Sequence, residues 1–384
     1  MSGLSHIPQF DPRRIYLFLR EEIDQAVSEV LDSGTYIGGE AVGHFEQQLA
    51  SFVGEGKEYR AVSCANGTDA LALALSLSRL KPGDEVLMPS HTYVAAAEMA
   101  VSQGLIPVWV DVEKEGYNVD PDPEHLEACM SRRTKAMVAV NIYGMPAAWP
   151  RLKDFCHNHG LLLIEDNAQG LGGSLDGKAL GSWGDVSTLS FFPTKPLGCM
   201  GDGGAVLGPS SDDMQRIAML ARHGQQGKYN YIEPGRNSRL DALQAAILSV
   251  KLRYLSQMQH FVRVIARSYA EALSDIEGLL LPQCSLLPNA QPSWHLFTIR
   301  VLGGQRDALR AFLSDRRIAA GLYYPAPLHR VPCYARIASP HSSPCIETDR
   351  LSEEILSLPI FPLMREEECE RVVDAVRSFF MINR

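Results

Sequence analysis

The residues best suited to chemistry are a lysine and an aspartate that follow two separate apolar segments. Lys195 lies in the segment SFFPTKPLG at 190–198, and the glycine-rich segment GDGG follows at 201–204. Asp166 comes shortly after the apolar run LLLI at 161–164. A lysine between a strand and such a turn, with a carboxylate ending another strand, is typical of sites that hold pyridoxal phosphate as a Schiff base. The pair predicts an enzyme that works through one amine, although a lysine taken alone is more often a loop residue.

The aspartate needs a partner because a carboxylate at the end of a core strand is costly to bury alone. A protonated pyridine nitrogen would be such a partner, and the carboxylate would keep the ring able to accept electrons. The other interpretation is that Asp166 caps the segment that follows it. Because Lys195 is also present, the cofactor interpretation of Asp166 is favoured.

A phosphate site is predicted at 63–70, where SCANGTDA follows the first expected strand. Asn66 can cap a helix whose first free N–H groups begin at Gly67, and such helix starts bind anions. An ordinary capped helix explains this segment equally well. The chain lacks the glycine patterns of dinucleotide and P-loop sites here, so a monophosphate cofactor fits better than NAD or ATP. Tyr93, after the second expected strand, either stacks on a planar ring or packs in the core.

Composition bounds the class of protein. The chain has 384 residues, of which 46% are hydrophobic and 21% charged, so it can form one large α/β core and a smaller second domain. Its formal net charge is -9, from 36 basic and 45 acidic residues, with no block of like charge. This balance argues against a nucleic-acid partner, although a few arginines and helix N-termini suffice to bind a nucleotide diphosphate.

The cysteines indicate a reducing compartment. All eight are scattered, without a C-x-x-C pair, in a chain too long to need disulfides. No apolar signal segment and no run of eighteen apolar residues is found, so we expect a cytoplasmic protein that does not span a membrane. Cys156, His157 and His159 could suggest a metal site, but they close an expected helix at 149–159 before Gly160, and we expect no metal.

The order of the expected elements predicts parallel βαβ units. Continuous apolar runs, as a sheet covered on both faces requires, predict strands at 59–64, 85–88, 107–112, 135–142, 161–165, 186–192 and 204–207. Helical patterns lie between most of them, at 68–80, 92–102 and 122–131. A long helical stretch at 239–272 precedes a second set of elements, with strands at 294–301 and 319–324 and helices at 306–316 and 365–380. We therefore expect a large domain over 1–250, which binds the cofactor, and a smaller C-terminal domain over 251–384.

An ordered series of motifs resembles the DegT/DnrJ/EryC1/StrS nucleotide-sugar aminotransferases. The matching segments run from LDSG at 31–34 through NGTDAL at 66–71, ED at 165–166, SFFPTK at 190–195, GDGG at 201–204, NSRLD at 237–241 and QAA at 244–246 to LP at 358–359. The resemblance implies the aspartate aminotransferase fold, fold type I of the pyridoxal phosphate enzymes, with a mainly parallel sheet and helices on both faces. It also implies an aminotransferase with L-glutamate as the amino donor.

The resemblance implies the following role for each site residue. Lys195 forms the Schiff base, Asp166 meets the ring nitrogen, Gln169 lies beside the ring hydroxyl, Tyr93 stacks on the ring, and Gly67, Thr68 and Ser190 hold the phosphate. Asn237 reaches the phosphate of the neighbouring subunit's cofactor, so a homodimer with shared active sites is expected. Some relatives carry histidine at the lysine position and are dehydratases, so the lysine favours transamination.

The motifs look most like those of C3 aminotransferases that act on UDP-2-acetamido-2-deoxy-3-oxo-glucuronate in O-antigen pathways. Arg239 could hold a carboxylate of the sugar or the donor, or form a salt bridge with Asp241 or another acid. Tyr324 and His329 are further candidates for substrate contacts.

Two departures from the family pattern concern the substrate. A common His-Tyr-Pro reads Tyr-Tyr-Pro at 323–325, and Asn167 replaces a frequent alanine. A C4 aminotransferase acting on a 4-keto-6-deoxy sugar nucleotide is therefore the close alternative. A catalytically silent regulatory protein that kept the fold is an alternative of another class.

Overall fold

A seven-stranded sheet forms the centre of the chain in the computed structural model, which describes residues 5–54, 58–77, 80–283 and 287–382. In spatial order its strands are β1 (Arg60–Cys64), β9 (Gly204–Gly208), β8 (Val186–Ser190), β5 (Leu162–Asp166), β4 (Thr134–Val140), β2 (Glu85–Pro89) and β3 (Ile106–Val110). Only β9 runs antiparallel to its neighbours, and the other pairs are parallel. The expectation of a mainly parallel sheet, with all seven of its strands, is confirmed.

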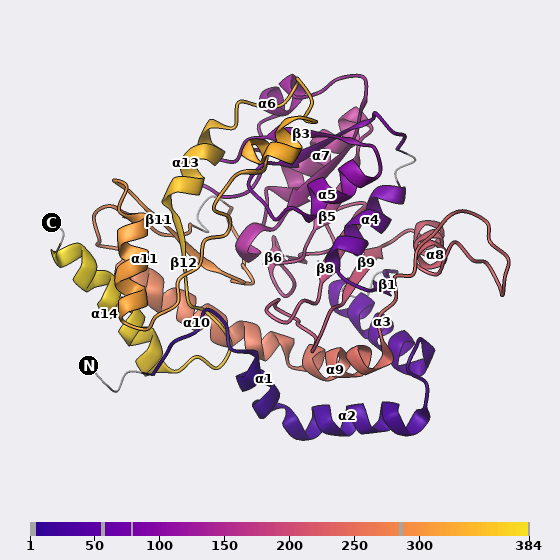
Figure 1. The fold of residues 1–384 in the computed structure, drawn as a ribbon, viewed down its shortest axis with the longest axis horizontal. Coiled ribbons are helices and arrows are strands. Elements are labelled where there is room, and N and C mark those ends of the chain that lie inside the picture. Colours follow the sequence, from indigo (N-terminus) through magenta and orange to yellow (C-terminus); the bar gives the residue numbers. More distant parts are fainter. Residues whose placement is uncertain (1–4, 55–57, 78–79, 284–286, 383–384) are drawn as a thin grey trace.

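Helices cover both faces of this sheet (Figure 1). One face packs against α4 (Gly67–Leu77), α5 (Ala95–Ser102) and α8 (Ser211–Leu220). The other face packs against α3 (Gly39–Gly54), α6 (Pro123–Ala128), α7 (Trp149–His159) and α9 (Ala242–Arg253). Successive strand residues point to opposite faces, so both faces must be apolar, and the strands are buried almost throughout.

The strand register determines which polar side chains share a face. On β5, Ile164 lies in the core beneath α4 and α5, so Asp166, two residues later, points to the same side. Asp166 pairs with Thr188 of the neighbouring β8, and Ser190 follows two residues after Thr188. Asp166, Thr188 and Ser190 therefore line one side of the carboxyl edge of the sheet.

The rest of the chain adds short elements around the sheet. At the N-terminal end lie α1 (Pro12–Phe18) and α2 (Arg20–Ser33), which the sequence analysis did not predict. Between β4 and β8 lie the 3-10 helix η1 (Ile142–Gly144) and the hairpin strands β6 (Ser174–Leu175) and β7 (Lys178–Ala179). The 3-10 helix η2 (Leu328–Arg330), α12 (Pro332–Ala335) and α13 (Ile346–Glu354) follow later.

A second hydrophobic core lies around a three-stranded antiparallel sheet. Its elements are β10 (Leu279–Leu280), β11 (Phe297–Val301), β12 (Ile355–Leu358), α10 (Leu255–Leu273), α11 (Arg306–Asp315) and α14 (Glu366–Ile382). The N-terminal Ile7 also packs in this core and pairs with Ile318. The division of the chain at residue 250 stays a prediction.

Two sequence-based expectations for this part of the chain are wrong. The segment 319–324 is not a strand: Gly321 forms one isolated bridge with Ser357, and β12 is the strand that pairs with β11. The helical stretch 239–272 is two helices, α9 and α10, interrupted at Tyr254. The two helices were read as one because both are rich in apolar residues, although α9 packs in one core and α10 mainly in the other.

No helix within the described residues is long and apolar enough to cross a lipid bilayer.

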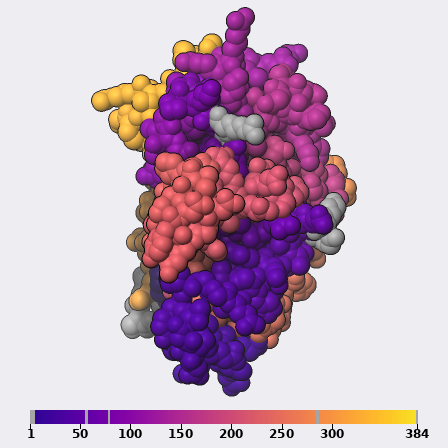
Figure 2. Space-filling view, turned by 90° about the vertical axis from the view of Figure 1, so that its right-hand side faces the viewer, coloured from indigo at the N-terminus to yellow at the C-terminus, as the bar shows by residue number. Residues whose placement is uncertain are grey.

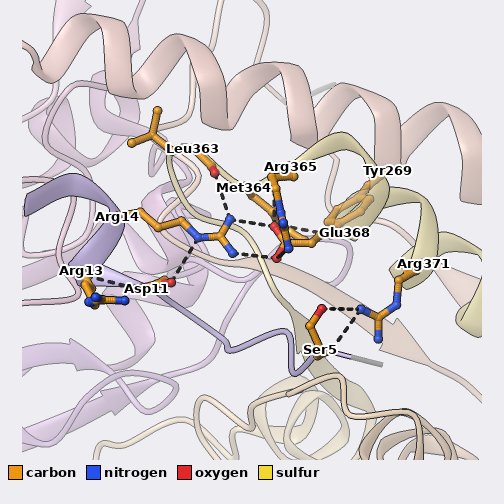
Figure 3. Close-up of polar contacts among 10 residues, drawn as sticks. All are labelled: Ser5, Asp11, Arg13, Arg14, Tyr269, Leu363, Met364, Arg365, Glu368 and Arg371. Atoms are coloured by element: carbon orange, nitrogen blue, oxygen red, sulfur yellow. Dashed lines mark hydrogen bonds and ion pairs between the residues drawn. The ribbon is translucent and has the colours of Figure 1, made fainter. Parts of the chain in front are cut away.

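An ion pair ties the N-terminal segment to the last helix (Figure 3). Both terminal guanidinium nitrogens of Arg14 donate to the Glu368 carboxylate, at 2.7 and 2.6 Å, and Arg365 Nη2 donates to it at 3.0 Å. The Glu368 side chain is 2% exposed. These donors, chiefly Arg14, lower the pKa of Glu368 from 4.5 to about 2. The carboxylate therefore contributes to stability above pH 4.5, and this contribution is lost as the pH falls towards 2.

We expect Glu368→Gln to lower the free energy of unfolding by about 3 kcal/mol at pH 7, the value that a pKa depressed by this amount implies. Urea unfolding at pH 7 measures the effect, and the difference from the unmodified protein should shrink as the pH falls below 4.5. Glu370→Gln, at an exposed position of the same helix, is the matched control and should change stability by less than about 0.5 kcal/mol. Equal effects of the two substitutions would contradict the conclusion that the ion pair between Arg14 and Glu368 stabilises the fold.

Candidate active site

The start of α4 forms a cradle at the carboxyl edge of the sheet. Asn66 caps the helix, and its Oδ1 accepts a hydrogen bond from the Asp69 N–H at 2.8 Å. Gly67 lies so close to β8 that a Cβ on it would stand 2.6 Å from the Ser190 Cβ. Gly67, Thr68 and Ser190 thus lie together, and the first N–H groups of α4 are available to an anion.

Asp166 and Lys195 interact across the same edge. Asp166 is 7% exposed, and burial raises the pKa of its carboxyl group, while the Ala168 N–H at 3.1 Å and the charge of Lys195 act in the opposite direction. Burial lowers the pKa of the Lys195 amine to about 8, and the charge of Asp166 opposes this shift. At pH 7 an amine with this pKa is neutral in roughly a tenth of the molecules, far more than an exposed lysine, and the neutral form is the one that acts as a nucleophile or base.

The predicted ring-contact residues also lie together. The Gln169 side chain is 3% exposed; its Oε1 accepts from the Tyr143 N–H at 2.7 Å, and its Nε2 donates to the Tyr324 hydroxyl at 3.2 Å. The ring of Tyr324 lies 5.7 Å from the ring of Tyr93, centroid to centroid, and Tyr93 is 56% exposed. Tyr93 therefore presents an accessible aromatic face beside Gln169, as a stacking residue requires.

His329 belongs to a chain of polar contacts next to Tyr93. Its Nδ1 lies 2.7 Å from the Ser90 Oγ, and its Nε2 lies 3.0 Å from the Asp349 Oδ1. Burial lowers the pKa of its imidazole, and Asp349 opposes the shift. The imidazole is thus fixed by its neighbours on both ring nitrogens, and its contact with a substrate stays a prediction.

Asn237 and Arg239 lie on the surface. Both are exposed, and the Arg239 Nε donates to the Asn237 Oδ1 at 2.8 Å. In the described part of the chain Arg239 forms no salt bridge, with Asp241 or any other acid. Arg239 lines a surface pocket of about 470 Å³ with Arg222 and His223. The contact of either residue with cofactor or substrate stays a prediction.

A buried carboxylate behind the site was not predicted. Glu165 is fully buried on the opposite face from Asp166 and has no cationic partner among the described residues. It accepts hydrogen bonds from four nitrogens, at 2.6 to 3.2 Å: the Asn141 Nδ2 and the backbone N–H groups of Gly181, Trp183 and Gly184. Glu165 thereby ties the end of β5 to the loop 181–184. The sequence signal was Asn141, a polar residue within the apolar run expected as a strand at 135–142.

Two histidines near the site were also missed. His91 is 1% exposed, its Nε2 lies 2.6 Å from the Tyr143 hydroxyl, and burial lowers the pKa of its imidazole to about 4. The pKa of His295 lies well below the ordinary value because of burial and the charge of Lys195. A histidine within an apolar segment gives no sequence signal of this kind, because residues far away in the chain bury it.

The residues present fit pyridoxal phosphate. The Thr188 Oγ1 is buried without a hydrogen-bond partner on the same side of the sheet as Asp166, so this wall of the site has unused polar capacity. The α4 cradle would hold the phosphate, Asp166 the ring nitrogen, and Lys195 the aldehyde carbon. No group of three or more metal-ligating side chains occurs within the described residues.

Comparison with known protein families and relatives gives consistent results. The model of the DegT/DnrJ/EryC1/StrS aminotransferase family matches residues 18–377. The dTDP-3-amino-3,4,6-trideoxy-alpha-D-glucose transaminase of Streptomyces venezuelae is 37% identical, over 97% of this chain and 96% of its own. The UDP-N-acetyl-3-dehydro-alpha-D-glucosamine 3-aminotransferase of Acidithiobacillus ferrooxidans is 37% identical, over 98% and 99%. The UDP-2-acetamido-2-deoxy-3-oxo-D-glucuronate aminotransferase of Pseudomonas aeruginosa is 36% identical, over 90% and 92%.

Solved structures confirm the expected fold and cofactor. DesV of S. venezuelae, in complex with a ketimine intermediate, superposes with a TM-score of 0.92 at 37% identity, over 98% of both chains. NtdA of Bacillus subtilis, with bound cofactor PMP, superposes with a TM-score of 0.89 at 26% identity, over 99% of this chain and 86% of its own.

We expect Gly67→Ala to weaken binding of pyridoxal phosphate about tenfold to hundredfold, because the new Cβ must displace α4 or Ser190 from the cradle. Fluorescence titration of the cofactor-free protein measures the affinity. Gly43→Ala is the matched control: Gly43 lies in α3, and a Cβ there would meet no atom within 4 Å, so affinity should not change. Equal affinity of Gly67→Ala and the unmodified protein would show that the phosphate binds elsewhere.

Proposed function

Because the chain belongs to the DegT/DnrJ/EryC1/StrS aminotransferase family and is a pyridoxal phosphate-dependent sugar-nucleotide aminotransferase, we propose that it aminates C3 of a nucleotide-linked keto sugar with L-glutamate as the donor. The substrate proposed first is UDP-2-acetamido-2-deoxy-3-oxo-glucuronate, and the product would serve surface polysaccharide synthesis such as that of O-antigen. The proposed compartment is the reducing cytoplasm, since the seven described cysteines are free thiols.

The observation that carries the proposal is the electrostatic pairing of Lys195 and Asp166 at the carboxyl edge of the sheet. When bound, pyridoxal phosphate supplies a ring that accepts negative charge from the substrate carbon. Asp166 offers a buried carboxylate that keeps a proton on the ring nitrogen. The neutral Nζ of Lys195 would take the proton from the substrate carbon and deliver it to the cofactor carbon on the other side of the transferred nitrogen. Tyr93 and Gln169 fix the plane in which this transfer takes place.

The names of the relatives support amination at C3. The S. venezuelae, A. ferrooxidans and P. aeruginosa enzymes are each named for a 3-amino product or a 3-keto substrate. Two of these names specify UDP sugars and one a dTDP sugar. Arg239 could pair with the carboxylate of a glucuronate or of glutamate in two parallel hydrogen bonds. Tyr323, where many relatives have histidine, and its neighbour Tyr324 would contact the sugar.

Exposed apolar side chains support a homodimer. Tyr229, Tyr231 and Ile232 are 74%, 61% and 54% exposed in the loop after α8, and Tyr36 is 49% exposed before α3. Figure 2 shows the salmon-coloured chain around α8 next to the indigo N-terminal part of the chain on one face of the molecule. Exposed apolar side chains of this size are typical of subunit interfaces. Asn237 is exposed on the same loop, where it could reach the site of a second copy.

Amination can be tested directly with the purified holoenzyme. We expect the visible absorption band of the bound cofactor to shift when L-glutamate is added, and the reverse reaction with 2-oxoglutarate to form glutamate from a UDP-3-amino sugar. A panel of UDP-, dTDP- and GDP-linked 3-amino and 4-amino sugars distinguishes the substrates. Lys195→Ala should reduce turnover at least about a thousandfold while the protein stays folded.

Three other results of these experiments would change the proposed function. Glutamate formed only from 4-amino sugars would replace the C3 proposal by the C4 alternative. A band that responds to no amino donor would favour a silent regulatory protein. Turnover by Lys195→Ala equal to that of the unmodified enzyme would exclude the lysine from catalysis.

The shared site is tested by mixing two variants. Lys195→Ala and Asn237→Ala alone should each have little activity, but a hybrid dimer contains one site with both native residues. Random reassociation should therefore restore about a quarter of the unmodified activity per site. Activity of the mixture no higher than the mean of the two variants would show that Asn237 acts within its own subunit or not at all.

A further inference from the structure

The turn that carries Lys195 is closed on itself. The N–H groups of Lys195 and Cys199 donate to the Phe192 and Phe191 carbonyls, each at 2.8 Å, and the Cys199 thiol also donates to the Phe191 carbonyl at 2.9 Å. A Cβ on Gly198 would stand 2.5 Å from the Pro193 carbonyl oxygen, so the two arms of the turn are in contact. The position of the Lys195 backbone therefore depends on where the whole turn is held.

A second buried lysine contacts this turn. Lys251, on α9, is 9% exposed, and its Nζ donates a hydrogen bond to the Gly198 carbonyl oxygen, three residues after Lys195. Among the described residues Lys251 forms no ion pair with a carboxylate. Burial lowers the pKa of its amine to about 8, and the nearby Cys199 opposes the shift. A lysine so placed is unusual, since lysines are almost never fully buried unless paired.

Gln244 holds the same turn at a second point. Its Oε1 accepts from the Met200 N–H at 2.8 Å, and its Nε2 donates to the Met200 carbonyl at 3.1 Å. Gln244 and Lys251 are seven residues apart, which places both on one face of α9. The two side chains thus form hydrogen bonds with the turn at Gly198 and Met200, on the C-terminal side of Lys195.

The helix that presents these side chains is itself firmly held. From Ala245 to Leu252 every residue of α9 is buried, and the helix packs against both α2 and α3. A buried helix moves little, so a loop attached to it at two points shares its rigidity. Cys199 lies between the two attachment points, and its Sγ is also 3.0 Å from the Gly201 carbonyl oxygen, so its single hydrogen is shared between two acceptors.

We propose that Lys251 is a positioning residue that, together with Gln244, fixes the turn from which Lys195 reaches the substrate. This inference rests on the proposed role of Lys195 as the reacting amine. The Lys251 amine donates its hydrogen bond to the Gly198 carbonyl oxygen, so Lys251 acts on the turn and through it on Lys195. Its loss leaves that carbonyl without a donor and frees the turn to shift, and a displacement of about 1 Å can cost a hundredfold in rate.

The test compares Lys251→Met with Lys135→Met. Methionine keeps the bulk of the aliphatic stem but removes the donor. The Lys135 Nζ donates to the Arg132 carbonyl at 2.9 Å on the surface, so its variant loses the same kind of bond far from the site. In the cofactor-free protein, we expect hydrogen exchange in residues 195–201 to become at least about tenfold faster in Lys251→Met, with β4 unchanged. In the holoenzyme, kcat should fall about tenfold to a hundredfold while the KM for the keto sugar changes less than about threefold.

Each other outcome has a defined meaning. Lys251→Met with unaltered exchange at 195–201, or with faster exchange but an unaltered kcat, overturns the proposal. If Lys251→Met does not fold, Gln244→Leu replaces it, because this substitution removes the second attachment point. An unaltered exchange rate at Met200, or an unaltered kcat, in Gln244→Leu also overturns the proposal. Borohydride reduction of the unmodified holoenzyme tests the proposed function separately. A Lys195 peptide without a pyridoxyl label refutes that function. A labelled peptide, together with unaltered hydrogen exchange at 195–201 in Lys251→Met, refutes only the positioning role of Lys251.

Discussion

The site depends on two opposite charges taken out of water at the same edge of one sheet. Burial raises the pKa of Asp166 and lowers the pKa of Lys195, so it favours the neutral form of each group. The charge of each group opposes the pKa shift of the other. With a pKa of about 8, the Lys195 amine has both protonation states within reach around neutral pH, although the protonated form predominates at pH 7. A base that takes up a proton and then gives it back needs a pKa close to the working pH.

The topology of the sheet brings these charges together. Parallel strands end at one edge, so Asp166 at the end of β5 and Ser190 at the end of β8 become neighbours although 24 positions separate them in the sequence. The antiparallel β9 returns the chain to β1, and there Gly204 allows the start of β9 to approach Asn66. The same sheet keeps Glu165 on its opposite face, where it is satisfied by amides alone. Adjacent carboxylates thus serve a reactive site and a structural one without competing.

The sequence predicted the parts of the site that depend on local order. Lys195, Asp166 and Asn66 each follow a recognisable apolar strand, and the period of the strands then predicts one shared edge. The contacts that lock the site come from residues distant in sequence, and no local pattern contains them: Ser90 meets His329, and Gln169 meets Tyr324. The segment 319–324 was misread for the same reason: Gly321 forms a single bridge to β12, and Ala320 and Leu322 are only partly buried against the second core.

Lys195 and Lys251 are two buried lysines to which we assign different roles. Burial lowers the pKa of both amines to about 8, so desolvation alone does not distinguish them. Lys195 has a carboxylate, Asp166, as its electrostatic partner at the carboxyl edge of the sheet. Lys251 faces a backbone carbonyl, which accepts a hydrogen bond from either protonation state of the amine and leaves no room for a reactant. A perturbed pKa therefore marks a buried lysine, and only the acceptor and the space around it tell a reacting amine from one that holds the backbone in place.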